Sequence, residues 1–238
     1  MFISKELLIS GAAEYGVTLT DDAVERFDIY AQMLVERNKV MNLTAITESD
    51  DIVRKHFVDS LSLLSVVDIP ENARVIDVGT GAGFPGIPLM IARPDLKMTL
   101  LDSTKKRLGF IEDVSRETSL EPELLHSRAE DAGKSEDYRE KYDLATARAV
   151  SNLRDLSEYC LPFVKKGGIF APMKSAKADE EIVSAKKAIH VLGGQIDKKV
   201  SFDLGDVGTR TVIVIKKISQ TPTKYPRPSA KMAKFPIE

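Results

Sequence analysis

The sequence predicts an α/β protein: a doubly wound, mostly parallel sheet with an N-terminal helical extension and an antiparallel C-terminal hairpin. Three observations predict it. Apolar residues recur at helical spacing before residue 70, which indicates the helical extension. Beyond residue 70, short apolar runs alternate with helical patterns, and two strand-like runs then end the sheet region. We therefore expect a helical region over 1–70, a sheet domain over 71–218 and a basic, proline-rich tail over 219–238.

Helices account for most of the first seventy residues. Thr20 precedes two acids, which is a helix start signal because a threonine side chain caps free N–H groups and acids favour the first turn. The apolar spacing of this helix continues to about Val40. Thr47–Asp50 has the Thr-x-x-Asp form of a capping box and predicts another helix, reaching about Val67 before Pro70 ends the region.

The sheet domain is predicted from the alternation of strand-like runs with helical patterns. Its strand-like runs are Arg74–Val78, Lys97–Leu101, Glu123–Ser127, Tyr142–Thr146 and Gly168–Met173. Helical patterns lie near Pro85–Ala92, Thr104–Thr118, Asn152–Val164 and Ala178–Leu192. Alternating strands and helices predict a parallel sheet covered on both faces. The closing hairpin comprises Lys198–Leu204 and Thr209–Lys217, joined by a turn at Gly205-Asp206-Val207-Gly208. The four prolines of the tail predict neither strand nor helix there.

Composition excludes several classes of protein. With 43% hydrophobic and 29% charged residues, the chain has the composition of an ordinary globule. A single cysteine, Cys160, excludes a disulfide framework and a cysteine-based metal cluster within the chain. No run approaches the roughly 18 apolar residues of a membrane span, and Glu6 interrupts the start where a signal peptide is apolar. We expect a cytoplasmic monomer with no metal and no membrane partner.

Charge is unevenly distributed along the chain. The net charge of −2 gives no overall preference for nucleic acid, but six basic residues and one acid lie between Lys216 and Glu238. A local basic tail supplies phosphate contacts even in a slightly acidic chain. The alternative interpretation of the same charges is a solvated, frayed C-terminus.

The segment that carries chemistry is Arg74–Gly86, where a strand ends in Asp77 and glycines alternate before a helix. Glycines allow a sharp turn and let a ligand lie against the backbone. The spacing of Gly81, Gly83 and Gly86 also satisfies the dinucleotide fingerprint, so an NAD-dependent oxidoreductase is one alternative and a tight turn without ligand another. Asp77 distinguishes them, because an acid there can meet a cationic amino group but repels a pyrophosphate.

A second acid, Asp102, ends the next predicted strand. A carboxylate at that place can accept hydrogen bonds from both ribose hydroxyls of a nucleoside. NAD also contains ribose, so Asp102 alone does not discriminate between the two ligands. Together with Asp77 it favours a nucleoside that carries a cationic group.

The string Asp77–Pro88 (Asp-Val-Gly-Thr-Gly-Ala-Gly-Phe-Pro-Gly-Ile-Pro) resembles the RsmG family, formerly called glucose-inhibited division protein B (GidB). These are class I, Rossmann-like, S-adenosylmethionine-dependent enzymes that methylate guanine N7 in 16S ribosomal RNA. Further segments that are similar to the family are Asn38–Thr44, Lys55–Leu61, Ser127–Glu130 and Ala147–Ala149. The resemblance runs from about residue 20 to 217, and Pro228–Phe235 departs from the family's usual ending.

The resemblance implies S-adenosyl-L-methionine as the methyl donor and a set of residues around it: Asp77, Gly79, Gly81, Gly83, Phe84, Asp102, Ser103, Ala129, Glu130 and Arg148. The glycines and the backbone near Phe84 would hold the methionine part. Asp102 and Ser103 would bind the ribose, and Ala129 and Glu130 would flank the adenine. Arg148 would border the cofactor and the target base; a surface ion pair is its alternative role.

The resemblance also includes His56 and Asp59, three residues apart on one predicted helix and therefore on the same side of it. A role in shaping the site and a purely structural role both stay open for His56. No catalytic acid or base is assigned, because guanine N7 carries a lone pair and no proton. A cysteine nucleophile is not supported, since Cys160 falls in a predicted helix, and Ala145–Ala149 stands where amine methyltransferases carry their Asn/Asp-Pro-Pro-aromatic signature.

The implied partner is 16S ribosomal RNA or the small ribosomal subunit, with a guanosine of the 530 loop as the target. Candidate phosphate contacts are Arg37, Lys39, Arg54, Lys55, Lys105, Lys106, Arg107 and the tail. Two further alternatives share the same nucleoside-binding features. One is a small-molecule methyltransferase, and the other is a non-enzymatic small-subunit assembly factor that binds the cofactor.

Overall fold

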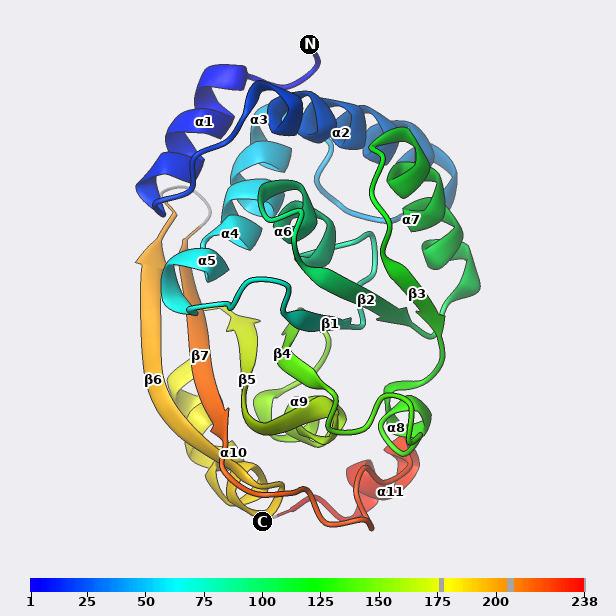
Figure 1. Cartoon of the computed structure of the whole chain (residues 1–238), viewed down its shortest axis with the longest axis vertical. Helices are drawn as coiled ribbons and strands as arrows, with labels where there is room; N and C mark the ends of the chain where they lie inside the picture. Colours follow the sequence, from blue (N-terminus) through cyan, green and yellow to red (C-terminus); the bar gives the residue numbers. More distant parts are fainter. Residues whose placement is uncertain (176–177, 205–207, 238) are drawn as a thin grey trace.

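The computed structural model describes residues 1–175, 178–204 and 208–237. Within these ranges lies a seven-stranded sheet in the order β3-β2-β1-β4-β5-β7-β6 (Figure 1). The strands are β1 (Arg74–Val78), β2 (Lys97–Asp102), β3 (Glu123–His126), β4 (Tyr142–Arg148), β5 (Val164–Lys174), β6 (Gly194–Asp203) and β7 (Thr209–Lys217). Strands β1 to β5 are parallel, and β7 is antiparallel to both β5 and β6. The order reverses between β1 and β4, and ligands bind at the carboxyl ends of strands beside such a reversal.

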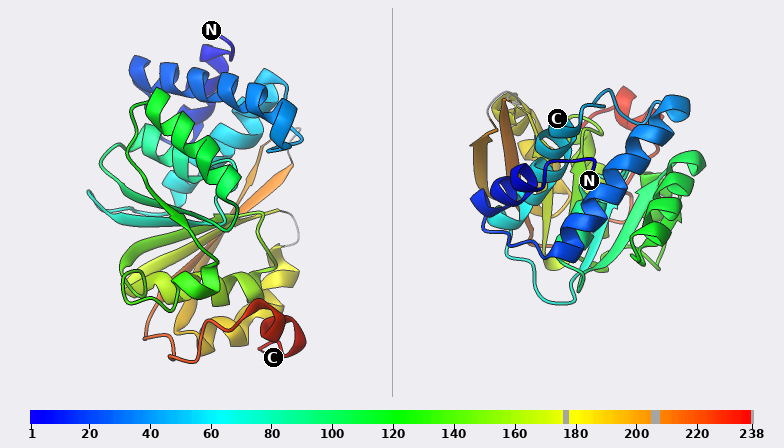
Figure 2. Two further views of the ribbon diagram at one scale, coloured as in Figure 1. Left: turned by 90° about the vertical axis from the view of Figure 1, so that its right-hand side faces the viewer. Right: turned by 90° about the horizontal axis from the view of Figure 1, so that it is seen from above.

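Helices cover both faces of the sheet (Figure 2). One layer contains α1 (Lys5–Glu14), α2 (Asp21–Met41), α3 (Ser49–Ile52), the π-helix η1 (Val53–Val58), α4 (Asp59–Leu61), α5 (Leu63–Val66), α6 (Gly86–Ala92) and α7 (Lys105–Glu117). The other contains α8 (Ala129–Ala132), α9 (Leu153–Cys160), the 3₁₀ turn η2 (Leu161–Phe163), α10 (Ala178–Val191) and α11 (Ser229–Lys234). Among the described helices, none is both long and apolar enough to span a membrane.

Two hydrophobic cores hold the layers together, one on each face of the sheet. Successive residues of a strand point to opposite faces, so Val75 packs in the core beneath α2 while Ile76 packs in the core above α9. The N-terminal helices belong to the first core through side chains such as Phe27 and Leu34, which are fully buried. Cys160 is buried in the second core, at the end of the helix in which the sequence placed it.

The predicted alternation of strands and helices is confirmed, with local differences. Strand β5 begins at Val164 rather than at Gly168, because a register shift lets Val164 pair with Tyr142 ahead of the regular ladder. Strand β6 begins at Gly194, earlier than predicted, since its first residues are mostly polar on an outer strand. Of the predicted hairpin turn, residues 205–207 lie outside the described part of the chain.

Of two helix starts predicted in the N-terminal region, one is confirmed and the other is wrong. Thr20 caps α2 as expected, its hydroxyl accepting a hydrogen bond from the Ala23 N–H at 3.1 Å. The capping box at Thr47 is wrong, because α3 begins at Ser49 after Glu48 and no side chain caps it. The single helix predicted from there to Val67 is instead four short segments, one of them a π-helix.

The prediction that the tail contains no helix is wrong. Helix α11 occupies the proline-free stretch that follows Pro228, a residue whose fixed φ suits a helix start. The tail is also anchored to the domain. Arg227 forms an ion pair with the buried Glu158 at 2.7 Å, and the side chain of Tyr225 is buried in the second core. At the end of β7, the buried Lys217 ammonium donates to two backbone carbonyls, and burial lowers its pKa to about 8.

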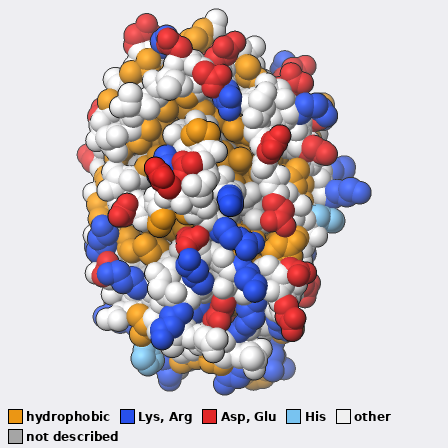
Figure 3. Space-filling model, in the orientation of Figure 1, with side chains coloured by type: hydrophobic (Ala, Val, Ile, Leu, Met, Phe, Trp, Pro, Cys, Tyr) orange, Lys and Arg blue, Asp and Glu red, His pale blue; other side chains and the backbone are white. Residues whose placement is uncertain are grey.

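Both signs of charge appear on the surface. Figure 3 shows acidic and basic side chains mixed over the upper half of one face, while Lys and Arg side chains gather in its lower half. This distribution agrees with a chain of nearly balanced net charge that carries local basic areas.

Candidate active site

The loop between β1 and α6 turns back over the carboxyl end of the sheet. The N–H groups of Gly79 and Thr80 both donate to the carbonyl oxygen of Leu101, at 2.8 and 3.0 Å, which fixes the loop to β2. Gly79 has φ +73°, a left-handed conformation that other residues rarely adopt. A Cβ atom at Gly79 would lie 2.8 Å from the Val150 side chain, so the backbone there is closely approached from the β4 side.

Asp77 lies beneath this loop and is fully buried. Its Oδ2 accepts hydrogen bonds from the Thr80 hydroxyl at 2.7 Å and from the Gly86 N–H at 3.0 Å. Its Oδ1 has no hydrogen-bond partner within the described part of the chain. Burial raises the pKa of this carboxyl to about 6, against the lowering effect of those two hydrogen bonds. Asp77 therefore braces the loop from below and leaves one buried oxygen without a donor.

A cavity of about 360 Å³ lies in front of the loop, and five residues of the sequence-predicted set line it: Gly79, Asp102, Ser103, Ala129 and Glu130. The Asp102 carboxylate is nearly buried and already ordered, because it accepts from the Gly81 and Thr104 N–H groups at 3.0 and 2.8 Å. The residues that the sequence analysis missed in this cavity are Arg107, Arg128, Val150, Tyr159 and Ser229, among others. Ser229 belongs to α11, whose presence the prolines had argued against.

Five of the predicted residues do not line this cavity: Gly81, Arg148, which lines a second cavity described below, and Asp77, Gly83 and Phe84. Asp77 lies below the loop, and Gly83 faces the hydroxyl of Tyr30, which would lie 2.9 Å from a Cβ atom there. Phe84 is buried and stacks against Tyr30, with ring centroids 5.2 Å apart. The Tyr30 hydroxyl donates to the Ala82 carbonyl oxygen at 2.6 Å, so helix α2 supports the loop from the side opposite the cavity.

Arg148, at the end of β4, is the centre of a second cluster. Its guanidinium donates to Asp59 Oδ2 at 2.8 Å, to the Lys55 carbonyl oxygen at 3.2 Å and to His56 Nδ1 at 3.2 Å. It also lies over the Phe84 ring, 4.8 Å from the centroid, as a cation–π pair. The ion pair considered as an alternative for Arg148 is thus present, but with a partner that is 2% exposed rather than at the surface.

His56 is held in one tautomer by its neighbours. Because Nδ1 accepts from Arg148, Nε2 carries the proton and donates to the Thr44 hydroxyl at 2.9 Å. The ring stacks on Phe84 with centroids 4.4 Å apart. Burial and the Arg148 charge lower the pKa of His56 to about 3, so the imidazole is neutral near pH 7.

A second cavity, of about 330 Å³, opens beside this cluster. His56, Asp59, Arg148, Lys174 and Arg210 are among the residues that line it. Ala149 lines both this cavity and the one in front of the glycine loop. Ala149 also has a left-handed backbone, with φ +57°, immediately after Arg148. The two cavities therefore meet at the end of β4.

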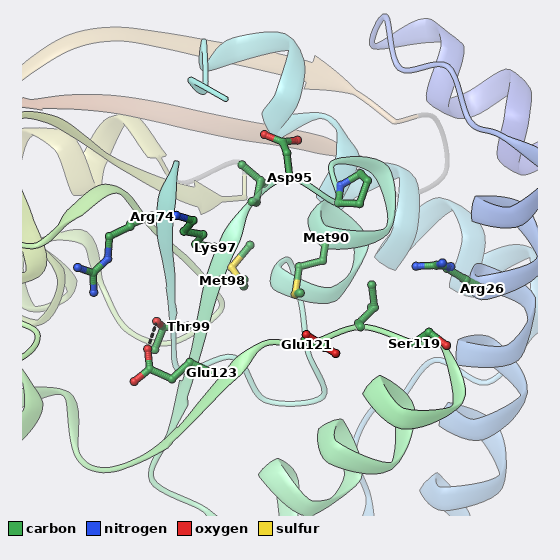
Figure 4. Close-up of a pocket in the computed structure, with 13 residues that line it drawn as sticks. Arg26, Arg74, Met90, Asp95, Lys97, Met98, Thr99, Ser119, Glu121 and Glu123 are labelled. Atoms are coloured by element: carbon green, nitrogen blue, oxygen red, sulfur yellow. Dashed lines mark hydrogen bonds between the residues drawn. The ribbon is translucent and has the colours of Figure 1, made fainter. Parts of the chain in front are cut away.

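A larger cavity, of about 560 Å³, lies at the opposite end of the strands (Figure 4). Arg74 and Lys97, the first residues of β1 and β2, line it together with Glu123, which accepts a hydrogen bond from Thr99. No residue of the predicted cofactor set lines it. Its place at the amino ends of the strands separates it from the reversal in strand order where ligands bind.

Comparison with known proteins identifies the family. Residues 23–207 match the family model described as rRNA small subunit methyltransferase G (GidB). The chain belongs to the RsmG family. Two RsmG relatives, both named "Ribosomal RNA small subunit methyltransferase G", show how complete the match is. The Alkaliphilus oremlandii protein is 49% identical, over 98% of this chain and 99% of its own. The Bacillus velezensis protein is 46% identical, over 98% of each chain.

Solved structures agree on the RsmG chain's fold. TrmN from Thermus thermophilus has a TM-score of 0.54 at 19% identity, covering 68% of this chain and 48% of that one. An S-adenosylmethionine-dependent O-methyltransferase from Thermotoga maritima has a TM-score of 0.53 at 16% identity, covering 79% and 72%. The fold is that of class I methyltransferases, as the sequence predicted. Within the described ranges, no three His, Cys, Asp or Glu side chains are grouped so as to hold a metal ion.

Proposed function

We propose that this chain transfers a methyl group from S-adenosyl-L-methionine to N7 of a guanosine in the 530 loop of 16S ribosomal RNA. One observation carries the proposal: the cavity lined by five of the predicted cofactor residues meets a second cavity, which Arg148 lines, at Ala149. Two adjoining cavities at the carboxyl edge of the sheet suit a donor and an acceptor that must come into contact.

The residues of the first cavity fit S-adenosyl-L-methionine, which supplies a methyl group activated on a sulfonium. Asp77 lies beneath the loop and outside the cavity, so it would act indirectly, by bracing the loop through Thr80 and Gly86. Gly79 presents backbone where the methionine part would lie, with Gly81 beside it. Asp102 and Ser103 would bind the ribose, while Ala129 and Glu130 would flank the adenine. Gly83 and Phe84 would act indirectly, by keeping the loop in shape.

The acceptor chemistry needs positioning rather than a base. N7 of guanine has an in-plane lone pair and no proton to lose, so it attacks a methyl group directly without a covalent enzyme intermediate. The neutral His56 and the ion-paired Asp59 orient Arg148 at the boundary between the cavities. Holding reactants in a near-attack arrangement contributes up to roughly 7–11 kcal/mol to a reaction of this kind. Arg148 would add electrostatic control at the reacting edge of the base.

We propose that 16S ribosomal RNA, free or within the small ribosomal subunit, is bound by a monomer in the cytoplasm. Of the predicted phosphate contacts, Lys39, Arg54, Lys105 and Lys106 are exposed. Arg37 and Lys55 are engaged in ion pairs with Asp113 and Asp51. Exposed lysines and arginines give salt-dependent affinity for phosphates, and the choice of base comes from contacts with the base itself.

The test is transfer of labelled methyl from S-adenosyl-L-methionine to small subunits and to free 16S RNA, both from a strain that lacks this gene. Borohydride and aniline treatment cleaves RNA at N7-methylguanosine and maps the product. We expect one cleavage, in the 530 loop, that Gly79→Asp abolishes. Transfer to a metabolite extract but not to RNA would instead indicate a small-molecule enzyme. Cofactor-independent binding to small subunits, with no transfer to any substrate, would indicate an assembly factor.

A further inference from the structure

We propose that the cavity beside Arg148 receives the target base and that Asp59 selects guanine by accepting a hydrogen bond from its Watson–Crick edge. The inference rests on the proposed function and adds the residue that determines the choice of base. It follows from one buried carboxylate oxygen that accepts no hydrogen bond from the described residues, from the size and lining of the second cavity, and from the place of Arg148 between Asp59 and Ala149.

The second cavity has the size and polarity of a binding site for a planar polar group. Its volume of about 330 Å³ lies at the lower end of the ~300–1,000 Å³ typical of small-ligand clefts. Apolar side chains from Ile46 and Met173 line it together with charged ones. A cavity with apolar walls and a few fixed polar groups suits an unstacked base, which RNA-binding proteins commonly recognise in loops.

Asp59 lines this cavity with an incomplete set of hydrogen bonds. The residue is 2% exposed, and its Oδ2 accepts from Arg148. Its Oδ1 is buried and forms an ion pair with Arg210, whose Nε atom is 3.6 Å away, but accepts no hydrogen bond from the described residues. Leaving a buried charged acceptor without a donor is costly, and the few cases in native proteins call for an explanation. A ligand that brings a hydrogen-bond donor to Oδ1 would explain why this oxygen accepts none from the protein.

Guanine offers donors where Asp59 needs them. Its Watson–Crick edge carries the N1–H and N2–H groups, whereas adenine has a lone pair at N1. A carboxylate that meets this edge accepts a hydrogen bond from guanine and faces an unprotonated acceptor in adenine. The Asp59 Oδ1 atom therefore discriminates between the two purines.

The order of residues along the cavity wall matches the order of atoms around the base. In guanine, O6 lies between N1 and N7. Along the wall, Arg148 is bonded to Asp59 on one side and is followed by Ala149, which borders the cofactor cavity, on the other. Described residues use three of the five N–H donors of Arg148, which leaves two for O6. With N1 at Asp59 and O6 at Arg148, N7 points toward the cofactor cavity.

The backbone just before Asp59 is also irregular. Asp59 directly follows the π-helix Val53–Val58, and π-helical turns are rare and frequently occur at functional sites. This segment presents the Lys55 carbonyl, His56 and Asp59 together to Arg148. The irregular turn thus fixes the orientation of the guanidinium and of the carboxylate at once.

The test compares wild type with Asp59→Asn on small subunits reconstituted with guanosine or adenosine at the mapped position. We expect kcat/KM for the guanosine subunit to fall about 10- to 100-fold, the effect of losing a hydrogen bond to a charged group. We expect transfer to the adenosine subunit to rise above that of wild type, because the new amide can donate to adenine N1. Asp179→Asn, an exposed acid on α10 paired with Lys199, is the matched control and should behave as wild type.

The outcomes separate this inference from the proposed function. If wild type transfers no methyl to guanosine subunits, the proposed function itself fails. If Asp59→Asn is as active as wild type on guanosine, the assignment of Asp59 is wrong. If it loses activity on guanosine and gains none on adenosine, Asp59 acts only by positioning Arg148, and base selection by Asp59 is overturned. Equal S-adenosyl-L-methionine affinity of both variants, measured by calorimetry, shows that the first cavity is intact.

Discussion

The two cavities at the end of β4 are built in different ways. The first is lined mainly by four short segments at or just after the ends of strands, 78–79, 101–103, 127–130 and 149–151. The second depends on side chains from segments far apart in the chain, held by buried charges: Arg148 and Asp59 are 89 residues apart and bonded at 2.8 Å. In the first cavity, Gly79 is the position most sensitive to substitution, because its backbone is left-handed and Val150 approaches it closely. A cavity made of interlocked charged groups loses its shape when one group is removed.

The largest effect should follow removal of Arg148. Arg148→Met leaves Asp59 buried without its principal counter-charge, which typically costs about 3–5 kcal/mol of unfolding free energy. Methyl transfer should fall about 10²- to 10³-fold, while S-adenosyl-L-methionine affinity changes little. Urea denaturation, calorimetry and single-turnover assays measure the three quantities. Arg93→Met, which removes an ion pair with Asp95 at the other end of the sheet, is the control and should leave transfer intact.

Lowering the pH should reduce the stability of the folded protein through His56, which lines the second cavity. Its folded pKa of about 3 lies below the unfolded value of 6.5, so the unfolded chain takes up a proton first as pH falls. Relative to His56→Gln, wild type should lose on the order of 4 kcal/mol between pH 6.5 and pH 3. Urea midpoints at stepped pH values measure this difference. Parallel curves for the two proteins would contradict a neutral, buried imidazole.

The same change of pH should stabilise the folded protein through Asp77, which lies beneath the glycine loop. The folded pKa of Asp77, about 6, lies above its unfolded value of 3.8, so the folded chain takes up the proton first. This contribution is fully present below pH 3.8 and is lost as pH rises through 6. Relative to Asp77→Asn, wild type should gain on the order of 2–3 kcal/mol between pH 6 and pH 4. A difference that stays constant with pH would show that Asp77 is ionised throughout.

A smaller effect is expected from Gly79→Ala. The new methyl group would meet Val150 and sit where the backbone should face the cofactor, so affinity for S-adenosyl-L-methionine should fall about tenfold or more. Gly16→Ala is a close match, since Gly16 has φ +72° and open space around its Cα. Both variants carry the same backbone strain of roughly 1 kcal/mol. Loss of cofactor affinity in both would mean that strain, rather than the cavity, is responsible.

The smallest effect should come from Tyr30→Phe, which removes the hydrogen bond to the Ala82 carbonyl oxygen. We expect a loss of about 1 kcal/mol in stability and a several-fold loss of cofactor affinity, because the glycine loop loses its support from α2. Tyr142→Phe removes a buried hydroxyl bonded to Thr99 and should cost similar stability without affecting the cofactor. Identical cofactor affinities would contradict a supporting role for Tyr30.

The difference between the cavities also explains what could be predicted from the sequence. Asp102 could be placed at the site because it ends a strand beside β1, and parallel strands end at one edge. Glu130 was assigned through the family resemblance, and the structure places both residues in one cavity. The bond between Asp59 and Arg148 could not be predicted, since no local pattern relates residues 89 positions apart. Asp77 was correctly placed at the end of its strand, but its burial beneath the loop depends on packing from Thr80 and Gly86. The tail helix was missed because prolines were counted across the tail rather than located within it.

The position of β7 has a consequence for synthesis of the chain. The last strand to leave the ribosome is inserted between β5 and β6, which are made before it. Until residue 217 has emerged, β5 has an unpaired edge, and such edges attract other strands. The part of the sheet with order β3-β2-β1-β4-β5 can assemble while translation continues, but β6 has to wait for β7, which joins it to the sheet. Truncation within β7 should therefore yield a nascent protein that depends on chaperones, rather than a smaller stable enzyme.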